Sequence, residues 1–276
     1  MFPKRSRLAG MVAILTYHSQ NIRGDRPADN DHVALAADLA ALHETGKRVI
    51  TLDALMDWLE GKAGDETVAD AVALTFDDGC DLDVRDIEYP GHGLQRSFLG
   101  IMEDFIGRLP SEGRPKLHVS SFVIASREAR RQIDAVSLFG QGWINDDWWR
   151  AADAEGLFSI ENHGWDHNHP ALEGDARGNF HTVDSHEQCM EQVVRAAEAI
   201  GETTGRRPKY FAYPFGESSA YIREVFFPEF SDLHGCRAAL GTDPGPVTRT
   251  ANRWNLPRYV CGRDWASPQE LVSLLG

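Results

Sequence analysis

Two carboxylates stand side by side where an apolar run of the chain stops. The segment Ala73–Gly79 (ALTFDDG) places Asp77 and Asp78 directly after residues typical of a buried strand. In parallel α/β folds, ligands collect at the carboxyl ends of the strands. Adjacent carboxylates repel each other unless a cation lies between them, so this pair favours a metal site. Taken alone, the segment has an alternative as an Asp-Gly turn that closes a strand.

A histidine cluster follows a second apolar run, in the segment Glu161–Pro170 (ENHGWDHNHP). His163 and His167 are four residues apart, so one helical turn would place both imidazoles on one side of the backbone, and imidazole is a common zinc ligand. Gly164 stands where a zincin carries its general base, which excludes that class. Two histidines and one aspartate leave coordination positions open for water and substrate, as hydrolytic sites require. The alternative is a polar loop without ligands.

The elements that must position these groups alternate along the chain. Short runs rich in Val, Ile, Phe and Thr are separated by segments with helical spacing, a pattern typical of a parallel sheet covered by helices. Seven such runs favour a barrel, and the fold class expected is α/β. The predicted strands are 12–17, 72–76, 117–124, 158–162, 210–213, 237–241 and 256–260. The predicted helices are 33–42, 94–109, 144–154, 193–200 and 268–275.

One connection is long and rich in turn residues. Residues 81–115 carry Tyr-Pro-Gly-His-Gly and Pro-Ser-Glu-Gly-Arg-Pro around the predicted helix 94–109. Long ordered loops in compact folds tend to be functional, although a plain surface insertion is the alternative. No linker or repeat divides the chain, so we expect one catalytic domain over residues 1–276 with an insertion at about 81–116.

Composition excludes several classes of protein. The chain has 28 basic and 42 acidic residues and a net charge of −14, which argues against nucleic acid as a partner. The apolar run 8–17 follows three basic residues but lacks the small-residue cleavage site of a signal peptide, and no run is long enough to span a membrane. Four scattered cysteines form no C-x-x-C pair, so a reducing, cytoplasmic location is expected.

Three motifs carry a resemblance to a known family. The segments Thr75–Gly79 (TFDDG), Asn162–His167 (NHGWDH) and Phe211–Gly216 (FAYPFG) resemble, in this order, the first three motifs of polysaccharide deacetylases, the NodB-homology enzymes of carbohydrate esterase family four. The match spans roughly residues 11–260. The resemblance implies a distorted (β/α) barrel of about seven parallel strands. It also implies metal-dependent removal of an acetyl group from a sugar.

The resemblance assigns roles to the first two motifs. It makes Asp78, His163 and His167 the ligands of a divalent metal, with Zn²⁺ expected and Co²⁺, Ni²⁺ or Mn²⁺ as alternatives. It makes Asp77 the general base that takes a proton from metal-bound water. His169-Pro170 falls two residues later than the family's usual His-Pro pair, so His169 competes with His167 as a ligand.

The third motif supplies the substrate groove in the family. The resemblance implies that the backbone N–H of Phe215 donates to the oxyanion. It also implies that Tyr213, Pro214 and Phe215 form the substrate and oxyanion set. For Tyr213 a core position in a turn around Pro214 is the alternative.

Some positions depart from the family pattern. Ala212 replaces the arginine that usually holds the base aspartate, Gly164 replaces a Ser or Thr, and no Leu-x-x-His follows residue 260 to supply a general acid. The chain is most similar to the poly-N-acetylglucosamine deacetylase subgroup, which has an early Tyr-His and a late Leu-Pro-Arg. In that pattern His18 is the general acid and Arg258 replaces the missing arginine beside Asp77. The alternatives are a strand-end histidine that is only hydrogen-bonded and a Leu-Pro-Arg that only closes a strand.

The function expected is a metal-dependent hydrolase that removes an acyl, usually acetyl, group from an N-acylated sugar by cleaving a non-peptide C–N bond. One alternative is a small-molecule amide or formamide hydrolase that uses the same site. The other is a degenerate, non-catalytic carbohydrate-binding protein, against which the intact Asp77-Asp78 pair argues because binding alone needs no general base. The substrate is therefore an N-acylated sugar or a small amide, and the sequence indicates no oligomeric state.

Overall fold

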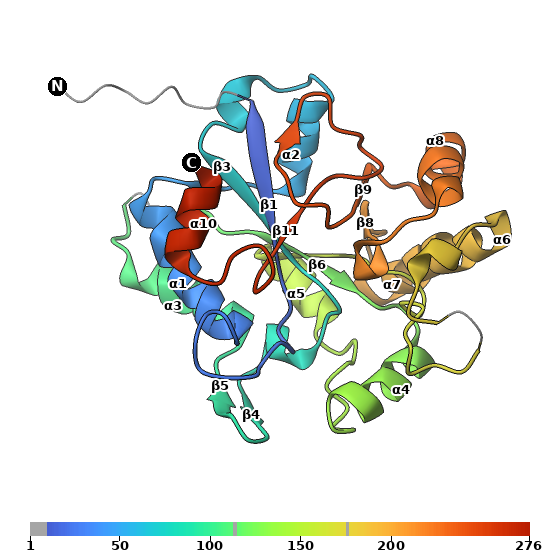
Figure 1. Ribbon diagram of the computed structural model, residues 1–276, viewed down its shortest axis with the longest axis horizontal. Coiled ribbons are helices and arrows are strands. Elements are labelled where there is room, and N and C mark those ends of the chain that lie inside the picture. Colours follow the sequence, from blue (N-terminus) through green and yellow to red (C-terminus); the bar gives the residue numbers. More distant parts are fainter. Residues whose placement is uncertain (1–9, 113–114, 175–176) are drawn as a thin grey trace.

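A computed structural model describes residues 10–112, 115–174 and 177–276 (Figure 1). The strands are β1 (Met11–Tyr17), β2 (Arg48–Val49), β3 (Ala71–Phe76), β4 (Ile87–Tyr89), β5 (Gly93–Gln95), β6 (Val119–Val123), β7 (Phe158–Asn162), β8 (Tyr210–Ala212), β9 (Ala238–Leu240), β10 (Val247–Thr248) and β11 (Tyr259–Val260). The α-helices are α1 (Asp31–Glu44), α2 (Leu52–Leu59), α3 (Phe98–Arg108), α4 (Arg127–Ser137), α5 (Trp149–Glu155), α6 (His186–Cys189), α7 (Ala196–Thr204), α8 (Phe227–Glu229), α9 (Ser231–His234) and α10 (Pro268–Leu275). Met190–Arg195 and Ile222–Phe226 are π-helical.

The main sheet consists of parallel strands in the order β1-β3-β6-β7-β8-β9. The last predicted strand joins its two ends, because Leu256 bridges Leu240 of β9 while Tyr259 of β11 pairs with Leu15 of β1, both in parallel. The sheet therefore curls into a barrel of seven parallel strands, with β10 added antiparallel at the start of β1. The predicted fold class, a distorted (β/α) barrel of about seven strands, is confirmed.

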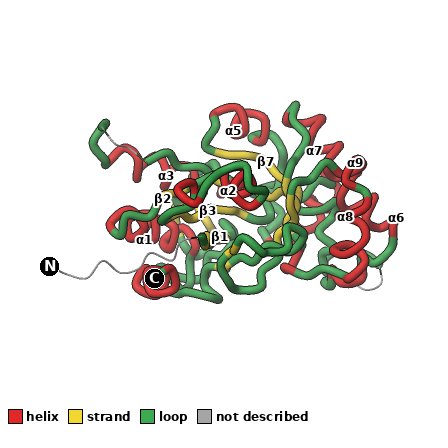
Figure 2. The backbone as a smooth tube through the Cα atoms, turned by 90° about the horizontal axis from the view of Figure 1, so that it is seen from above, coloured by secondary structure: helices red, strands yellow, loops and turns green. Residues whose placement is uncertain are grey.

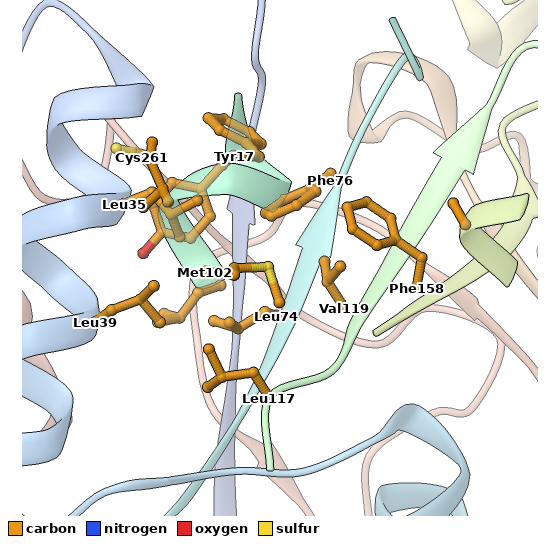
Figure 3. Close-up of a cluster of buried hydrophobic side chains, with 14 of the residues drawn as sticks. Tyr17, Leu35, Leu39, Leu74, Phe76, Met102, Leu117, Val119, Phe158 and Cys261 are labelled. Atoms are coloured by element: carbon orange, nitrogen blue, oxygen red, sulfur yellow. The ribbon is translucent and has the colours of Figure 1, made fainter. Parts of the chain in front are cut away.

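Alternation along each strand separates two apolar layers. Leu74 and Phe76 of β3 pack outward with Leu35 and Leu39 of α1 and with Met102 of α3, as Figure 3 shows. Ala73 belongs to the layer inside the barrel, and Thr75 on the same side bonds to Thr16 of β1. Figure 2 shows the strands in the middle of the molecule, with α1 and α3 at one end and α6 to α9 at the other. Because the strands are covered on both faces, they are apolar along most of their length.

Most expected elements are present with shifted ends. The strand 158–162 and the helix 268–275 agree fully with the prediction. The helix predicted from residue 94 begins only at Phe98, because residues 93–95 pair with β4 in a hairpin and the Ser97 side chain caps the helix. The helices α2, α4, α6, α8 and α9 were not predicted. Residues 113 and 114 of the predicted insertion lie outside the described residues.

Within the described ranges, no helix has the length and apolar character needed to cross a membrane.

Candidate metal centre

Three predicted ligands converge at the carboxyl ends of β3 and β7. The Asp78 Oδ1 atom lies 3.4 Å from His163 Nε2 and 3.3 Å from His167 Nε2. The ligand atoms of these residues all lie within 4.8 Å of one another, which makes them the one three-residue group of this kind among the described residues. The strand order explains the convergence, because only β6 separates β3 from β7 in the sheet.

The orientation of the histidines fits a metal. The Nδ1 atom of His163 lies 2.9 Å from the carbonyl oxygen of Ala212, so Nδ1 carries the proton and Nε2 presents its lone pair toward Asp78. A lone pair that faces a carboxylate is repelled unless a cation or a proton lies between them. Burial lowers the pKa of His163, but the charges of Asp77 and Asp78 and the hydrogen bonds to Asp78 and Ala212 together raise it more, and the net shift is upward. The site therefore demands positive charge at the position where a metal would bind.

Asp77 is held inside the barrel by an arginine. The Arg258 guanidinium donates two hydrogen bonds to the Asp77 carboxylate, with N–O distances of 2.8 and 2.9 Å. It also donates to the Gly241 carbonyl at 2.8 Å and to Thr75 Oγ1 at 3.2 Å. Burial raises the pKa of Asp77, but Arg258, His163 and His18 together lower it more, and the net shift is downward. The contact expected between Arg258 and Asp77 is present, and it keeps the carboxylate ionised.

Left-handed backbone conformations gather at the centre. Asp78, His167 and Phe215 have φ angles of 75°, 62° and 59°, values that residues other than glycine rarely adopt. Such strain persists only where the surrounding structure holds it, and it clusters at functional sites. Gly79, which follows Asp78, has a φ of 66°, and a Cβ atom there would lie 2.5 Å from Val123 Cγ1. The glycine of the first motif is therefore required by the close approach of β6.

Gly164 has a physical reason where the family carries Ser or Thr. Its φ is 90°, and a Cβ atom would lie 3.1 Å from Gln192 Oε1. Gln192 accepts a hydrogen bond from the Trp165 N–H at 3.0 Å and donates one to Asp166 Oδ1 at 2.7 Å. Gln192 thus fixes, through these two hydrogen bonds, the loop between the two histidine ligands.

The third motif divides between the site and the core. Phe215 is 42% exposed, lines the cavity beside the ligands and meets the His167 ring edge-on at 4.5 Å. Pro214 is buried beneath the Gly164 turn, and its part in contacting substrate is not supported. The prediction that Tyr213 walls the groove is wrong. Its side chain is wholly buried among aromatic residues, and its hydroxyl donates to the Trp254 carbonyl at 2.8 Å.

The two remaining histidines both line a cavity of about 370 Å³ that contains the centre. His18 follows β1 and shares the cavity with Asp77, as expected from the adjacency of the first and last strands. His169 lies 5.7 Å from the His167 ring, and its Nδ1 accepts from the Ala171 N–H at 3.1 Å. His169 lies outside the ligand group, so the geometry favours His167 as the second histidine ligand.

Two contributions to the site were missed in the sequence. The Gln20 side-chain amide donates to Asp78 Oδ2, the carboxylate oxygen turned away from the histidines. Its position two residues after His18, at the same strand end, was the available signal. The other is an apolar wall that comes largely from α4 and the loop after it.

Comparison with known proteins agrees with the motifs. Residues 114–226 match the family model for polysaccharide deacetylase, a region that holds the second and third motifs. No curated protein matches the sequence.

The fold is similar to that of IcaB from Ammonifex degensii, with 19% identity, coverage of 96% of this chain and 97% of that one, and a TM-score of 0.66. It is also similar to a de-N-acetylase from Aggregatibacter actinomycetemcomitans (14% identity, 96% and 99% coverage, TM-score 0.65). A third similar structure is Streptococcus pyogenes deacetylase PplD in complex with acetate, with 14% identity, coverage of 98% of this chain and 100% of that one, and a TM-score of 0.63. The resemblance to polysaccharide deacetylases is confirmed.

Proposed function

Starting from this polysaccharide deacetylase resemblance, we propose that the chain is a metal-dependent hydrolase that removes an acyl group from the nitrogen of an amino sugar. One observation carries the proposal. A buried, ionised Asp77, clamped by Arg258, lies next to the Asp78, His163 and His167 group. A ligand-binding protein needs neither a clamped base nor open metal positions, so this arrangement argues against a non-catalytic carbohydrate binder.

The residues present suit a divalent cation. Asp78, His163 and His167 would hold it through one oxygen and two nitrogens, a set that Zn²⁺ accepts readily and that Co²⁺, Ni²⁺ and Mn²⁺ also tolerate. When bound, such an ion supplies Lewis acidity, which acidifies water and polarises a carbonyl.

The remaining groups of the chain divide the proton transfers. Asp77 accepts a proton from the attacking water at a carboxylate oxygen, and Arg258 keeps that carboxylate from turning toward Asp78. The Phe215 N–H donates to the carbonyl oxygen as negative charge develops on it. His18 donates a proton to the departing amine, which is too basic to leave without one.

A sugar substrate is supported by the surface next to the centre. His18, Gln20 and Arg263 line both the central cavity and an adjoining hollow of about 500 Å³. Asn21 and Arg23 extend this hollow with further hydrogen-bonding groups. No carboxylate lines it among the described residues, although the chain has 42 acidic residues. The hollow offers donors and acceptors for several hydroxyl groups.

The test is acyl release from a defined panel of substrates. Zinc-loaded and chelator-treated protein would be incubated with N-acetylglucosamine, its short oligomers, and non-sugar amides and formamides, with released acid measured. We expect acetate from the N-acetylated sugars by the loaded protein only. Release from the simple amides alone would favour the small-amide hydrolase, and no release from any substrate would contradict the proposal.

A further inference from the structure

The central cavity has an apolar side that removal of an acetyl group does not explain. We propose that this side is a subsite for an alkyl chain of the substrate several carbons longer than an acetyl methyl group. We call it the apolar lobe and define it by Ile124, Ile133, Leu138 and Ile144, which all line the cavity that holds the metal ligands. The inference rests on the proposed function and adds a substrate class to it.

The apolar lobe is part of the hydrophobic core. Its four side chains are between 1% and 8% exposed. They belong to one packed cluster that also contains Leu82 and Ala129. The cavity therefore opens directly onto core side chains, where an apolar ligand displaces water from apolar surface.

The segment that carries Leu138 and Ile144 is fixed in place. The Asp134 carboxylate of α4 accepts hydrogen bonds from the backbone N–H groups of Gly142 and Trp143, at 2.8 and 2.7 Å. The Trp143 carbonyl accepts from the Asp81 N–H at 2.7 Å, which ties the loop to the chain just after the first motif. The apolar lobe is thus preformed, and a chain that enters it pays little ordering cost.

A sugar ring does not suit this side of the cavity. Cys80 lines the cavity, packs in the same cluster as the four aliphatic side chains and is already bonded to the Ser19 hydroxyl at 3.0 Å. Sugar hydroxyls placed against the four aliphatic side chains would lose water without gaining partners from them, which is unfavourable. The hydroxyl-binding groups lie instead toward His18, Gln20 and Arg263, which border the adjoining hollow. An acetyl methyl is one carbon and covers only part of four branched side chains.

The alkyl chain can come from either side of the bond that breaks. It is either the tail of a longer acyl group or an alkyl group on the amino-sugar part. Two series separate these sources: glucosamine with N-acetyl, N-butyryl or N-hexanoyl groups, and N-acetylglucosaminides with methyl, butyl or hexyl aglycones.

Binding is measured first, so that the result does not depend on turnover. Acetate, butyrate and hexanoate, and the three alkyl glucosaminides without their acetyl groups, would be titrated into zinc-loaded protein by calorimetry. We expect affinity to rise about fourfold for each methylene in at least one series, the increment for a fully buried methylene. Flat affinity in both series overturns the inference. Hydrolysis of both N-acyl series then shows on which side of the bond the chain lies.

A matched pair of variants on α4 locates the effect. Ile133 faces the cavity at 4% exposure, whereas Val136 on the same helix is 72% exposed. Ile133→Thr should flatten the chain-length dependence, and Val136→Thr should preserve it. Thermal melts check that both variants fold. If Ile133→Thr does not fold, the titrations of the wild-type protein alone test the inference. Equal chain-length dependence in both folded variants overturns the assignment of the lobe.

Failure of the inference is separable from failure of the proposed function. Hydrolysis of N-acetyl sugars without any chain-length effect leaves the function standing and removes the alkyl subsite. Chain-length-dependent binding without hydrolysis of any substrate leaves the subsite and removes the deacylase. If neither chain-length-dependent binding nor hydrolysis is observed, the alkyl subsite and the deacylase function are both overturned.

Discussion

The guanidinium of Arg258 holds the carboxylate of Asp77 in two parallel hydrogen bonds inside the barrel, and neither side chain reaches solvent appreciably. The pair joins the end of β3 to the segment that closes the barrel onto β1. It therefore couples the position of the base to closure of the sheet. Arg258 also bonds to Thr75 of β3 and to the carbonyl of Gly241, just after β9, so its orientation is fixed from two strands.

Loss of this arginine should damage both stability and activity. Arg258→Ala leaves Asp77 buried without a partner, and breaking a buried ion pair typically costs about 3–5 kcal/mol of unfolding free energy. The pKa of Asp77 is depressed in the folded protein, so the pair stabilises the wild type above the unfolded pKa, near 4, and this contribution fades as the pH falls through the folded value. Denaturant unfolding at pH 7 and pH 3 should show a variant deficit that is larger at pH 7. An equal deficit at both pH values would contradict the ion-pair account.

Metal binding and base catalysis should separate in two variants. His163→Ala removes a ligand and should lose the metal while the chain stays folded. Asp77→Asn should retain the metal but lose at least about a hundredfold in turnover, because an amide accepts no proton from water. Metal content and circular dichroism of the same preparations check both. Full metal occupancy in the His163 variant, or wild-type turnover in the Asp77 variant, would refute the corresponding assignment.

Gln20 should act on the metal through Asp78. Its amide donates to the oxygen of Asp78 that faces away from the histidines, which leaves the other oxygen free to ligate. Groups that orient a ligand typically contribute about 10–100-fold to metal affinity. Gln20→Ala should weaken zinc binding in competition with a chromophoric chelator, and Gln269→Ala, at an exposed position, serves as the control. Unchanged affinity in the Gln20 variant would show that this contact does not position Asp78.

Much of this centre was predictable because each motif lies at the end of an apolar run. Parallel strands bring such ends to one rim, and the adjacency of the first and last strands brought Arg258 to Asp77. Tyr213 was misplaced because a motif does not reveal which face of a strand a residue occupies. Tyr213 shares its face with Phe211, which packs into the aromatic cluster outside the barrel.

The helix α4 escaped prediction for a different reason. Its sequence is mostly polar, and two of its buried residues, Arg130 and Asp134, are charged. The helix is held by polar contacts such as the ion pair between Arg130 and Asp146, at 2.9 Å. Its buried apolar residues, Ala129 and Ile133, do keep helical spacing, but two such positions in a mostly polar segment are too few to stand out, and the apolar lobe was missed with the helix.

A second buried aspartate should make stability depend on pH in the opposite direction from Asp77. Burial raises the pKa of Asp83 to about 8, despite hydrogen bonds from Ser19 at 2.5 Å and Ser121 at 3.3 Å. A raised folded pKa means that stability is greatest below the unfolded value, near 4, and is lost as the pH rises toward 8. Asp83→Asn should flatten that decline in melting temperature, while Asp147→Asn at an exposed position should not. A parallel decline in the Asp83 variant would assign the pH dependence to another group.

The role of His18 is best tested by varying how much the leaving group needs a proton. An amine cannot leave as an anion, whereas 4-nitrophenolate leaves unprotonated near neutral pH, so only amide cleavage requires a general acid. His18 lines the cavity with Asp77, and its backbone N–H is anchored by Asp31 at 2.8 Å, so replacing the ring should not move the strand end. We expect His18→Gln to lower turnover of an N-acetyl sugar by about 100-fold or more and to leave hydrolysis of 4-nitrophenyl acetate within a few-fold of wild type.

His169→Gln is the matched control, because His169 lines the same cavity outside the ligand group. If the His169 variant shows the selective loss on the amide instead, His169 is the acid. If His18→Gln lowers both reactions equally, His18 positions the site and does not donate the proton.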